Sequence, residues 1–74
     1  MVDLLPVTSD MVASLGYDTE RSVLYVLFNT GKAYEYHNVP PEEYQALLSA
    51  ESKGTYMRTH IINHYDYSLF KGWK

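Results

Sequence analysis

The 74-residue chain has no cysteine. Without thiols, neither a disulfide framework nor a thiolate metal site can stabilise the fold, and a reducing cytoplasm is the simpler setting. The chain also lacks an apolar run near the roughly 18 residues that a membrane helix needs. Its N-terminus shows no basic segment followed by an apolar one. These absences predict a soluble, cytoplasmic protein that does not cross a membrane.

Basic residues are also scarce. Six Lys and Arg against nine Asp and Glu give a net charge of −3 and an isoelectric point near 5.4. Nonspecific nucleic-acid binding depends on counterion release by a basic surface, and the chain as a whole lacks that driving force. Any such binding must come from a local group of cations, for which Lys32, Lys53, Arg58 and Lys71 are available.

Aromatic residues, in contrast, are abundant. The chain holds eight Tyr, two Phe and one Trp, and each large ring can bury on the order of 150–250 Å². A domain of this size covers only about 60% of the surface of its unfolded chain, so the rings must supply much of the core. We predict a single domain over residues 1–74, with a core at about 9–66, an N-terminal arm at 1–8 and an aromatic C-terminal tail at 67–74.

Three segments have the alternation and the β-branched and aromatic content of strands: 10–17, 22–28 and 32–37. Residues 18–21 form a polar turn between the first two. The sequence Asn29-Thr30-Gly31 predicts a three-residue hairpin loop with Gly31 in the left-handed region. The strands are therefore expected to form an antiparallel meander.

The two turns predict a register for this meander. Pairing Phe28 with Lys32, and Tyr17 with Ser22, brings one consistent set of apolar side chains to the same face. A slip by one residue would turn all of them to the opposite face. The expected core face consists of Met11, Ala13, Leu15, Tyr17, Leu24, Val26, Phe28, Tyr34 and Tyr36.

Two helices are expected after the strands. Pro40-Pro41-Glu42-Glu43 predicts a helix start, with proline tolerated in the first turn and acids near the positive end of the dipole; this helix should end near residues 50–51. Ser52 is a good N-cap for a second helix that runs to about His64. The expected fold class is α+β, a three-stranded antiparallel β-meander followed by two short α-helices packed on one face (β-β-β-α-α). The apolar faces of the helices would consist of Tyr44, Leu47 and Leu48, and of Tyr56, Met57, Ile61 and Tyr65.

A motif extends across these elements: Leu24-x-Val26-x-Phe28-x-x-Gly31-x-x-Tyr34-x-Tyr36-x-x-Val39-Pro40, then Tyr44, Ala50-x-Ser52-x-Gly54-x-Tyr56 and Ile61. Over residues 9–66 the chain resembles the KTSC domain, a small domain named for its occurrence at the C-terminus of some lysyl-tRNA synthetases. This domain also occurs alone in short bacterial and phage proteins. The resemblance implies RNA binding, from the synthetase context alone, and is compatible with a phage or prophage origin. The motif positions carried over are Tyr34, Tyr36, Ser52 and Gly54, with no catalytic residue among them.

The start of the second helix, together with the tyrosine pair, is the candidate ligand site. Free backbone N–H groups at a helix start, a small glycine and nearby cations favour an anion, and a tyrosine ring can stack on a base. The alternative is structural: the serine only caps the helix, the glycine makes room for a ring, and both tyrosines belong to the core. The candidate ligand-binding residues are Tyr34, Tyr36, Ser52, Lys53, Gly54 and Arg58.

Features that indicate catalysis or metal binding are weak. His60 and His64 have the i, i+4 spacing of two metal ligands on a helix, but no His-Glu-x-x-His pattern surrounds them and a third ligand is not evident. The serines lie in no nucleophile-elbow motif. We therefore expect no enzymatic activity, no cofactor and no metal site.

The second face of the meander is unexpectedly apolar. Such a face would expose a contiguous patch that usually marks an interface. Either the N-terminal arm and the aromatic tail cover it, or a second copy or a host protein does. The candidate interface residues are Val12, Val23, Tyr25 and Leu27.

Two functional hypotheses follow. The first is a non-enzymatic binding module for a nucleotide or a short RNA or other single-stranded nucleic acid. The second is a protein–protein interaction module, either a homodimer or a small inhibitor of a host protein, that acts through the apolar sheet face.

Overall fold

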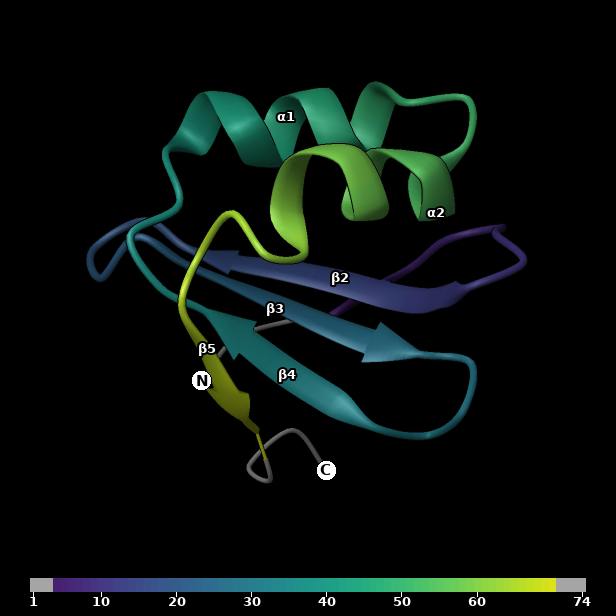
Figure 1. The fold of residues 1–74 in the computed structure, drawn as a ribbon, viewed down its shortest axis with the longest axis horizontal. Coiled ribbons are helices and arrows are strands. Elements are labelled where there is room, and N and C mark those ends of the chain that lie inside the picture. Colours follow the sequence, from purple (N-terminus) through teal and green to yellow (C-terminus); the bar gives the residue numbers. More distant parts are fainter. Residues whose placement is uncertain (1–3, 71–74) are drawn as a thin grey trace.

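The computed structural model describes residues 4–70 and shows an α+β fold in which helices cover one face of an antiparallel sheet (Figure 1). Within residues 4–70 the sheet has five strands in the order β1-β2-β3-β4-β5. The strands are β1 (Leu5–Pro6), β2 (Val12–Asp18), β3 (Val23–Phe28), β4 (Ala33–Tyr36) and β5 (Tyr67–Leu69). The helices are α1 (Pro41–Ser49), α2 (Lys53–Tyr56) and the π-helix η1 (Met57–Ile61), which continues α2.

The α+β class and the helices on one face are confirmed, but the prediction of three strands is wrong. Two short strands extend the meander at its two edges. In β1, Leu5 lies opposite Leu15, and in β5, Tyr67 lies opposite Tyr36. Neither segment has the length or alternation that marks a strand in sequence, and each is held extended by the neighbour with which it pairs.

The β3–β4 hairpin has the predicted register. Val26 lies opposite Tyr34 and Leu24 opposite Tyr36. The loop closes with the Phe28 amide donating to the Lys32 carbonyl over 2.9 Å, and Gly31 has a φ of 92°, which a residue with a Cβ rarely adopts. Leu24, Val26 and Tyr36 consequently all face the helices.

The β2–β3 hairpin is shifted by two residues from the predicted register. Tyr17 lies opposite Leu24 rather than Ser22, because the turn lies further along the chain. Its Asp18 carboxylate accepts from the amides of Glu20 and Arg21 at 3.0 and 3.2 Å. Ser22 takes the left-handed conformation with a φ of 58°. A shift of two residues does not change the face to which a side chain points, so Leu15 and Tyr17 keep their predicted face.

A β-bulge at the start of β2 corrects one of these assignments. The register changes between Val12 and Ser14, so that Val12 lies opposite Phe28. Val12 is fully buried among the core residues under the helices, and its placement on the outer face of the sheet was wrong. A bulge adds one residue to one strand, so the residues beyond it point to the face of the sheet opposite to the one that strict alternation predicts.

Both helices begin where predicted. Pro41 opens α1 after Pro40, with Glu42 and Glu43 in the first turn. Ser52 caps α2 by accepting from the Thr55 amide over 3.3 Å. The second helix ends at Ile61 instead of His64, since Ile62 is extended and Asn63 has a φ of 68°.

The core lies between the helices and the inner face of the sheet. Leu47 of α1 and both Met57 and Ile61 of η1 are fully buried against the sheet. Their spacing of four residues lets Met57 and Ile61 both reach the sheet from the π-helix, where the Ile62 amide donates to the Met57 carbonyl at 2.7 Å. The remaining buried residues of this cluster are Val12, Leu15, Leu24, Val26, Phe28, Tyr36 and Val39.

A single carboxylate joins the helices to the segment that precedes β5. Glu43 of α1 accepts from the hydroxyl of Tyr56 through Oε1 and from that of Tyr65 through Oε2, the latter at 2.9 Å. The bond to Glu43 raises the pKa of Tyr56 to about 12. Hydrogen bonds to a charged acceptor are stronger than neutral ones, and these two hold α1, α2 and the chain entering β5 together.

The outer face of the sheet is partly covered by the chain itself. The Phe70 ring packs against Tyr25 with the ring centroids 4.5 Å apart, and Tyr25 is only 6% exposed. Within residues 4–8 the N-terminal arm does not cross this face, because Leu5 and Pro6 pair with β2 at the sheet edge and Val7 packs against the core. Trp73 of the predicted tail lies outside the described residues. Among residues 4–70, no helix is long and apolar enough to cross a membrane.

The burial of α1 can be tested with neighbouring leucines. Leu47→Ala should lower the free energy of unfolding by about 2–5 kcal/mol, since it removes a fully buried side chain and leaves a cavity. Leu48 is partly exposed, so Leu48→Ala should have a clearly smaller effect. Urea denaturation measures both. Equal losses for the two variants would contradict the packing described for α1.

Alkaline pH should destabilise the protein through Tyr36. This residue is 4% exposed, and burial raises its pKa from 10.0 to about 12. The raised folded-state pKa favours the protonated form, so the stabilisation is complete below pH 10 and is lost as pH rises to about 12. The loss should be about 2–3 kcal/mol from this one group.

Tyr36→Phe should therefore flatten the decline in unfolding free energy above pH 10 while leaving the value at pH 7 nearly unchanged. Tyr56→Phe is the matched control. It also removes a tyrosine with a raised pKa, but it should already cost about 1 kcal/mol at neutral pH because the bond to Glu43 is lost. An unchanged alkaline slope in Tyr36→Phe would refute the assignment.

Candidate functional site

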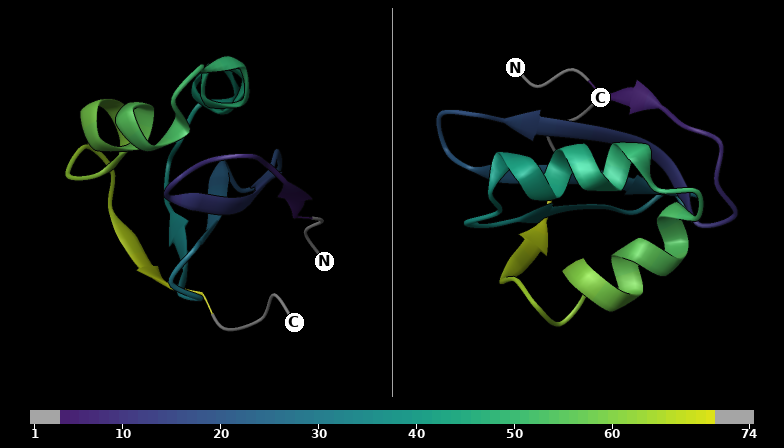
Figure 2. Two further views of the ribbon diagram at one scale, coloured as in Figure 1. Left: turned by 90° about the vertical axis from the view of Figure 1, so that its right-hand side faces the viewer. Right: turned by 90° about the horizontal axis from the view of Figure 1, so that it is seen from above.

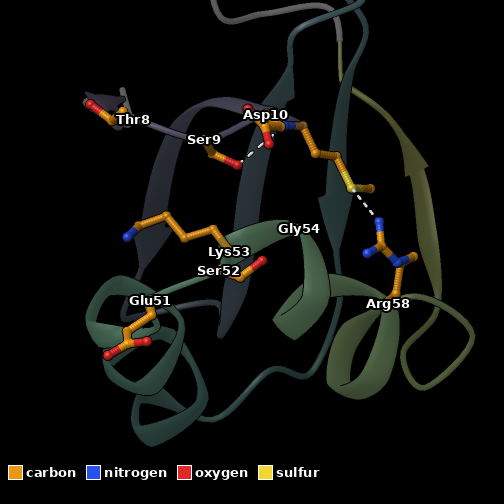
Figure 3. Close-up of a pocket in the computed structure, with 9 residues that line it drawn as sticks. Thr8, Ser9, Asp10, Glu51, Ser52, Lys53, Gly54 and Arg58 are labelled. Carbon is orange, nitrogen blue, oxygen red and sulfur yellow. Dashed lines mark hydrogen bonds between the residues drawn. The ribbon is translucent and has the colours of Figure 1, made fainter.

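A polar cleft lies between the loop that connects β1 to β2 and the start of α2 (Figure 3). Its volume is about 500 Å³, within the range of small-molecule sites. Four of the six predicted ligand-binding residues line it, from consecutive turns of one helical segment, and the loop contributes the opposite wall. The lining residues are Thr8, Ser9, Asp10, Met11, Glu51, Ser52, Lys53, Gly54 and Arg58.

The helix start is closed by its own side chains. The Ser52 hydroxyl accepts from the Thr55 amide and lies 2.9 Å from the Thr55 hydroxyl. The Lys53 ammonium group donates to the Ala50 carbonyl over 3.1 Å, which ties the end of α1 to the start of α2. Both side chains therefore form hydrogen bonds that stabilise the start of the helix. The capping role that the alternative interpretation gave Ser52 is confirmed.

Gly54 is required by close packing. A Cβ at this position would lie 3.2 Å from Met11 Cβ, tighter than an ordinary contact, and 3.4 Å from Met11 Sδ. The glycine thus makes room for a methionine of the loop, not for a tyrosine ring as the structural alternative supposed. This contact brings the loop against α2 at the cleft.

Arg58 is the cleft residue with the fewest internal ties. Its side chain is exposed, and its one hydrogen-bond contact within residues 4–70 is a guanidinium N–H directed at Met11 Sδ, 3.9 Å away. Sulfur is a weak acceptor, so most of the donors of the guanidinium remain available. Lys53 and Arg58 extend to opposite sides of Gly54 (Figure 3).

Charge in the cleft is balanced. Lys53 and Arg58 are offset by Asp10 and Glu51, and the hydroxyls of Thr8, Ser9 and Ser52 add neutral donors and acceptors. The Ser9 hydroxyl is engaged by the amides of Met11 and Val12 at 3.1 and 3.2 Å, which shapes the loop. A cleft with two cations, two carboxylates and several hydroxyls suits a ligand that carries both anionic groups and hydrogen-bond donors.

The tyrosine pair does not line this cleft, and the prediction that it adjoins the Ser52 helix start is wrong. Tyr34 and Tyr36 do face the helical side, as the strand parity predicted. They pack instead with Phe28 and with Tyr67 of β5. The centroid of the Tyr34 ring lies 5.6 Å from that of Phe28 and 5.5 Å from that of Tyr67. The chain entering β5 brings Tyr67 to this side, which the sequence did not indicate.

The four predicted interface residues do not share one face of the sheet. Val12 belongs to the core, as described above. Val23 and Tyr25 lie on the outer face but are only 7% and 6% exposed, and Leu27 is partly exposed. Larger exposed apolar side chains occur at the sheet edges, where Tyr67 and Leu69 of β5 are 60% and 57% exposed and Leu5 of β1 is 52% exposed.

His60 and His64 do not share a helix face. His60 lies in η1 and stacks on Tyr56 with the ring centroids 4.3 Å apart. His64 follows the end of the helix and lines a second, open cavity of about 450 Å³ near His37. No group of three potential metal ligands occurs among the residues that the structure describes.

The loop residues of the cleft were missed by sequence reasoning. Ser9 and Asp10 precede a strand, and nothing in their local pattern connects them with a helix start more than forty residues away. The signal that could have found them is Gly54, since a buried glycine within a helix indicates a close neighbour. The identity of that neighbour needed the fold.

Comparisons with known proteins agree with this fold. The family model of the KTSC domain matches residues 8–65. An uncharacterized protein of Stutzerimonas stutzeri (strain A1501) is 45% identical over 60 residues, which cover 80% of this chain and 84% of that protein. A protein of Tsukamurella paurometabola is 40% identical over 52 residues, covering 70% and 78%.

A solved structure shares the whole architecture. The crystal structure of a KTSC domain protein from Yersinia pestis superimposes with a TM-score of 0.93 and 28% sequence identity, covering 96% of this chain and 100% of that one. Residues 8–65, which the family model matches, contain β2–β4, α1, α2, η1 and all nine residues that line the cleft. The chain therefore belongs to the KTSC domain family.

Proposed function

We propose that this KTSC domain is a non-enzymatic binding module whose cleft takes a nucleotide or a short single-stranded nucleic acid. The observation that carries the proposal is the convergence of Ser52, Lys53, Gly54 and Arg58 with a hydroxyl-rich loop around one cleft of about 500 Å³. A nucleotide offers phosphate to the cations, and its ribose hydroxyls and base amino groups can donate to carboxylates. A ligand that carries only negative charges would be repelled by the carboxylates of Asp10 and Glu51.

The positions of the cations favour a ligand with more than one phosphate. Lys53 and Arg58 extend to opposite sides of Gly54 (Figure 3), so a ligand that engages both must cross the cleft. A short strand carries phosphates at regular intervals and can do so. With an overall charge of −3, the protein should bind such a strand weakly and with a low salt dependence, because few phosphates are neutralised.

Stacking on the tyrosine pair is not part of this mechanism. Tyr36 is 4% exposed and lies away from the cleft. Recognition in the cleft would therefore rest on phosphate and hydroxyl contacts, which position a strand without reading its sequence, and on base amino groups that donate to the carboxylates.

Arg58 provides the sharpest test of the proposal. Arg58→Gln should weaken the binding of a fluorescent oligonucleotide by about 5- to 10-fold and lower the salt slope by about 1, since one phosphate contact is lost. Its exposed side chain makes just the sulfur contact with the rest of residues 4–70, so folding should be unaffected. Lys32→Gln, at the β3–β4 turn outside the cleft, is the matched control. Fluorescence anisotropy at low and moderate salt measures the affinities.

Glu51→Gln tests the sign of the ligand charge. Removing this exposed carboxylate from the cleft should strengthen the binding of an anionic strand by a few-fold. Weaker binding of the same strand in this variant would mean that the Glu51 carboxylate accepts a hydrogen bond from the strand and does not mainly repel it. The proposal fails if no oligonucleotide or mononucleotide binds at low salt, or if Arg58→Gln and Lys32→Gln bind alike.

A further inference from the structure

The two edges of the sheet differ in how they resist pairing with another strand. Edge strands present unpaired backbone groups, and proteins usually protect them by shortness, proline, charge or a bulge. β1 is two residues long and contains Pro6, which has no N–H to donate. β5 contains Tyr67, Ser68 and Leu69, with no proline and no charge, and all three residues are exposed.

The backbone of β5 is directed so that it can accept a further strand. The His37 amide donates to the Asp66 carbonyl at 2.8 Å and the Phe70 amide donates to the Ala33 carbonyl at 2.9 Å. Residues in an antiparallel strand alternate in the side to which their N–H and C=O groups point. Asp66, Ser68 and Phe70 therefore bond toward β4, whereas the N–H and C=O groups of Tyr67 and Leu69 point to the open edge.

The exposed apolar side chains on this edge lie on one face. Tyr67 pairs with Tyr36 and Leu69 with Tyr34, so both share the helical side of the sheet with the tyrosine pair. The helices do not cover them: Tyr67 and Leu69 are 60% and 57% exposed, and α1 crosses the sheet away from β5 (Figure 2, right). Open backbone groups and exposed apolar side chains thus coincide at one edge.

We infer that β5 is a homodimer interface in which the β5 strands of two copies pair antiparallel across a two-fold axis at Ser68. In this register Tyr67 lies opposite Leu69 of the second copy, and both have backbone groups that point to the open edge, so two such pairs form four N–H···O bonds. Each pair places an aromatic ring beside an aliphatic side chain, a favourable cross-strand combination.

The second copy is favoured as the occupant because the edge complements itself. The three-residue strand carries no charge, so a two-fold arrangement brings no like charges together within it, although each chain has a net charge of −3. Asp66, the nearest acidic residue in the chain, lies opposite Phe70 of the second copy in this register. The Ser68 hydroxyl, bonded to His37 at 3.0 Å and to Glu35 at 3.3 Å, stays on the outer face and does not obstruct the axis.

An interface built on three residues is small, so the dimer should be weak and depend on concentration. Light scattering and sedimentation of the untagged full chain, from about 10 µM to about 1 mM, should show the mass rising from that of one chain toward twice that value. Leu69→Lys and Tyr67→Lys should each remain monomeric over this range. Leu5→Lys, on the opposite edge and 52% exposed, is the matched control and should associate like the parent.

Amide hydrogen exchange locates the contact without a mutation. The amides of Tyr67 and Leu69 should exchange quickly in dilute protein and slow down several-fold in concentrated protein, while the Ser68 amide is protected at both concentrations. This alternation distinguishes β5 pairing from association elsewhere and is independent of nucleic-acid binding in the cleft.

Four outcomes overturn the inference. The first is a parent chain that stays monomeric over the whole range. The second is a Leu69→Lys or Tyr67→Lys variant that folds and still associates like the parent. The third is a Leu5→Lys variant that is as monomeric as the β5 variants. The fourth is protection of Tyr67 and Leu69 only when a different protein is added, which would make a foreign strand the occupant.

Discussion

Side-chain alternation along the β3–β4 hairpin is the constraint on which the rest of the structure depends. Gly31 closes the loop in a left-handed conformation and fixes Leu24 opposite Tyr36. That register brings the apolar side chains of both strands to the face that Leu47 and Met57 cover. A slip by one residue would present Glu35 and Tyr25 to the helices instead. The residues that the structure describes form one core cluster, so no second cluster among them compensates for its loss.

Local patterns predicted the parts of the fold that local chemistry decides. The hairpin register, the proline start of α1 and the Ser52 cap each depend on a few adjacent residues. The parts that were missed depend on distant contacts. The bulge that buries Val12 forms against β3, and β1 and β5 are strands only because β2 and β4 pair with them. The π-helix, in which the Ile62 amide donates to the Met57 carbonyl, was also not indicated by the local pattern.

The candidate site divides in the same way. Ser52, Lys53, Gly54 and Arg58 lie within seven positions of one another, so their proximity was predictable from the sequence. The opposite wall, formed by residues 8–11, comes from the other end of the chain and is held there by the contact between Met11 and Gly54. The tyrosine pair illustrates the limit of strand parity: it identified the correct face of the sheet but not the neighbour, which is Tyr67.

The cleft and the open edge lie at different parts of the sheet, and this arrangement connects the two proposals. The loop wall of the cleft joins β1 to β2, whereas the proposed contact is on β5, at the opposite end of the strand order. Pairing through β5 would leave the loop walls of both copies uncovered and relate the two clefts by a two-fold axis. A nucleic-acid strand long enough to reach both clefts would bind the second cleft as an intramolecular step, at a high effective concentration. The weak contacts in the two clefts would then give the dimer a higher affinity for the nucleic acid than one cleft has alone, although neither acidic domain has a basic surface.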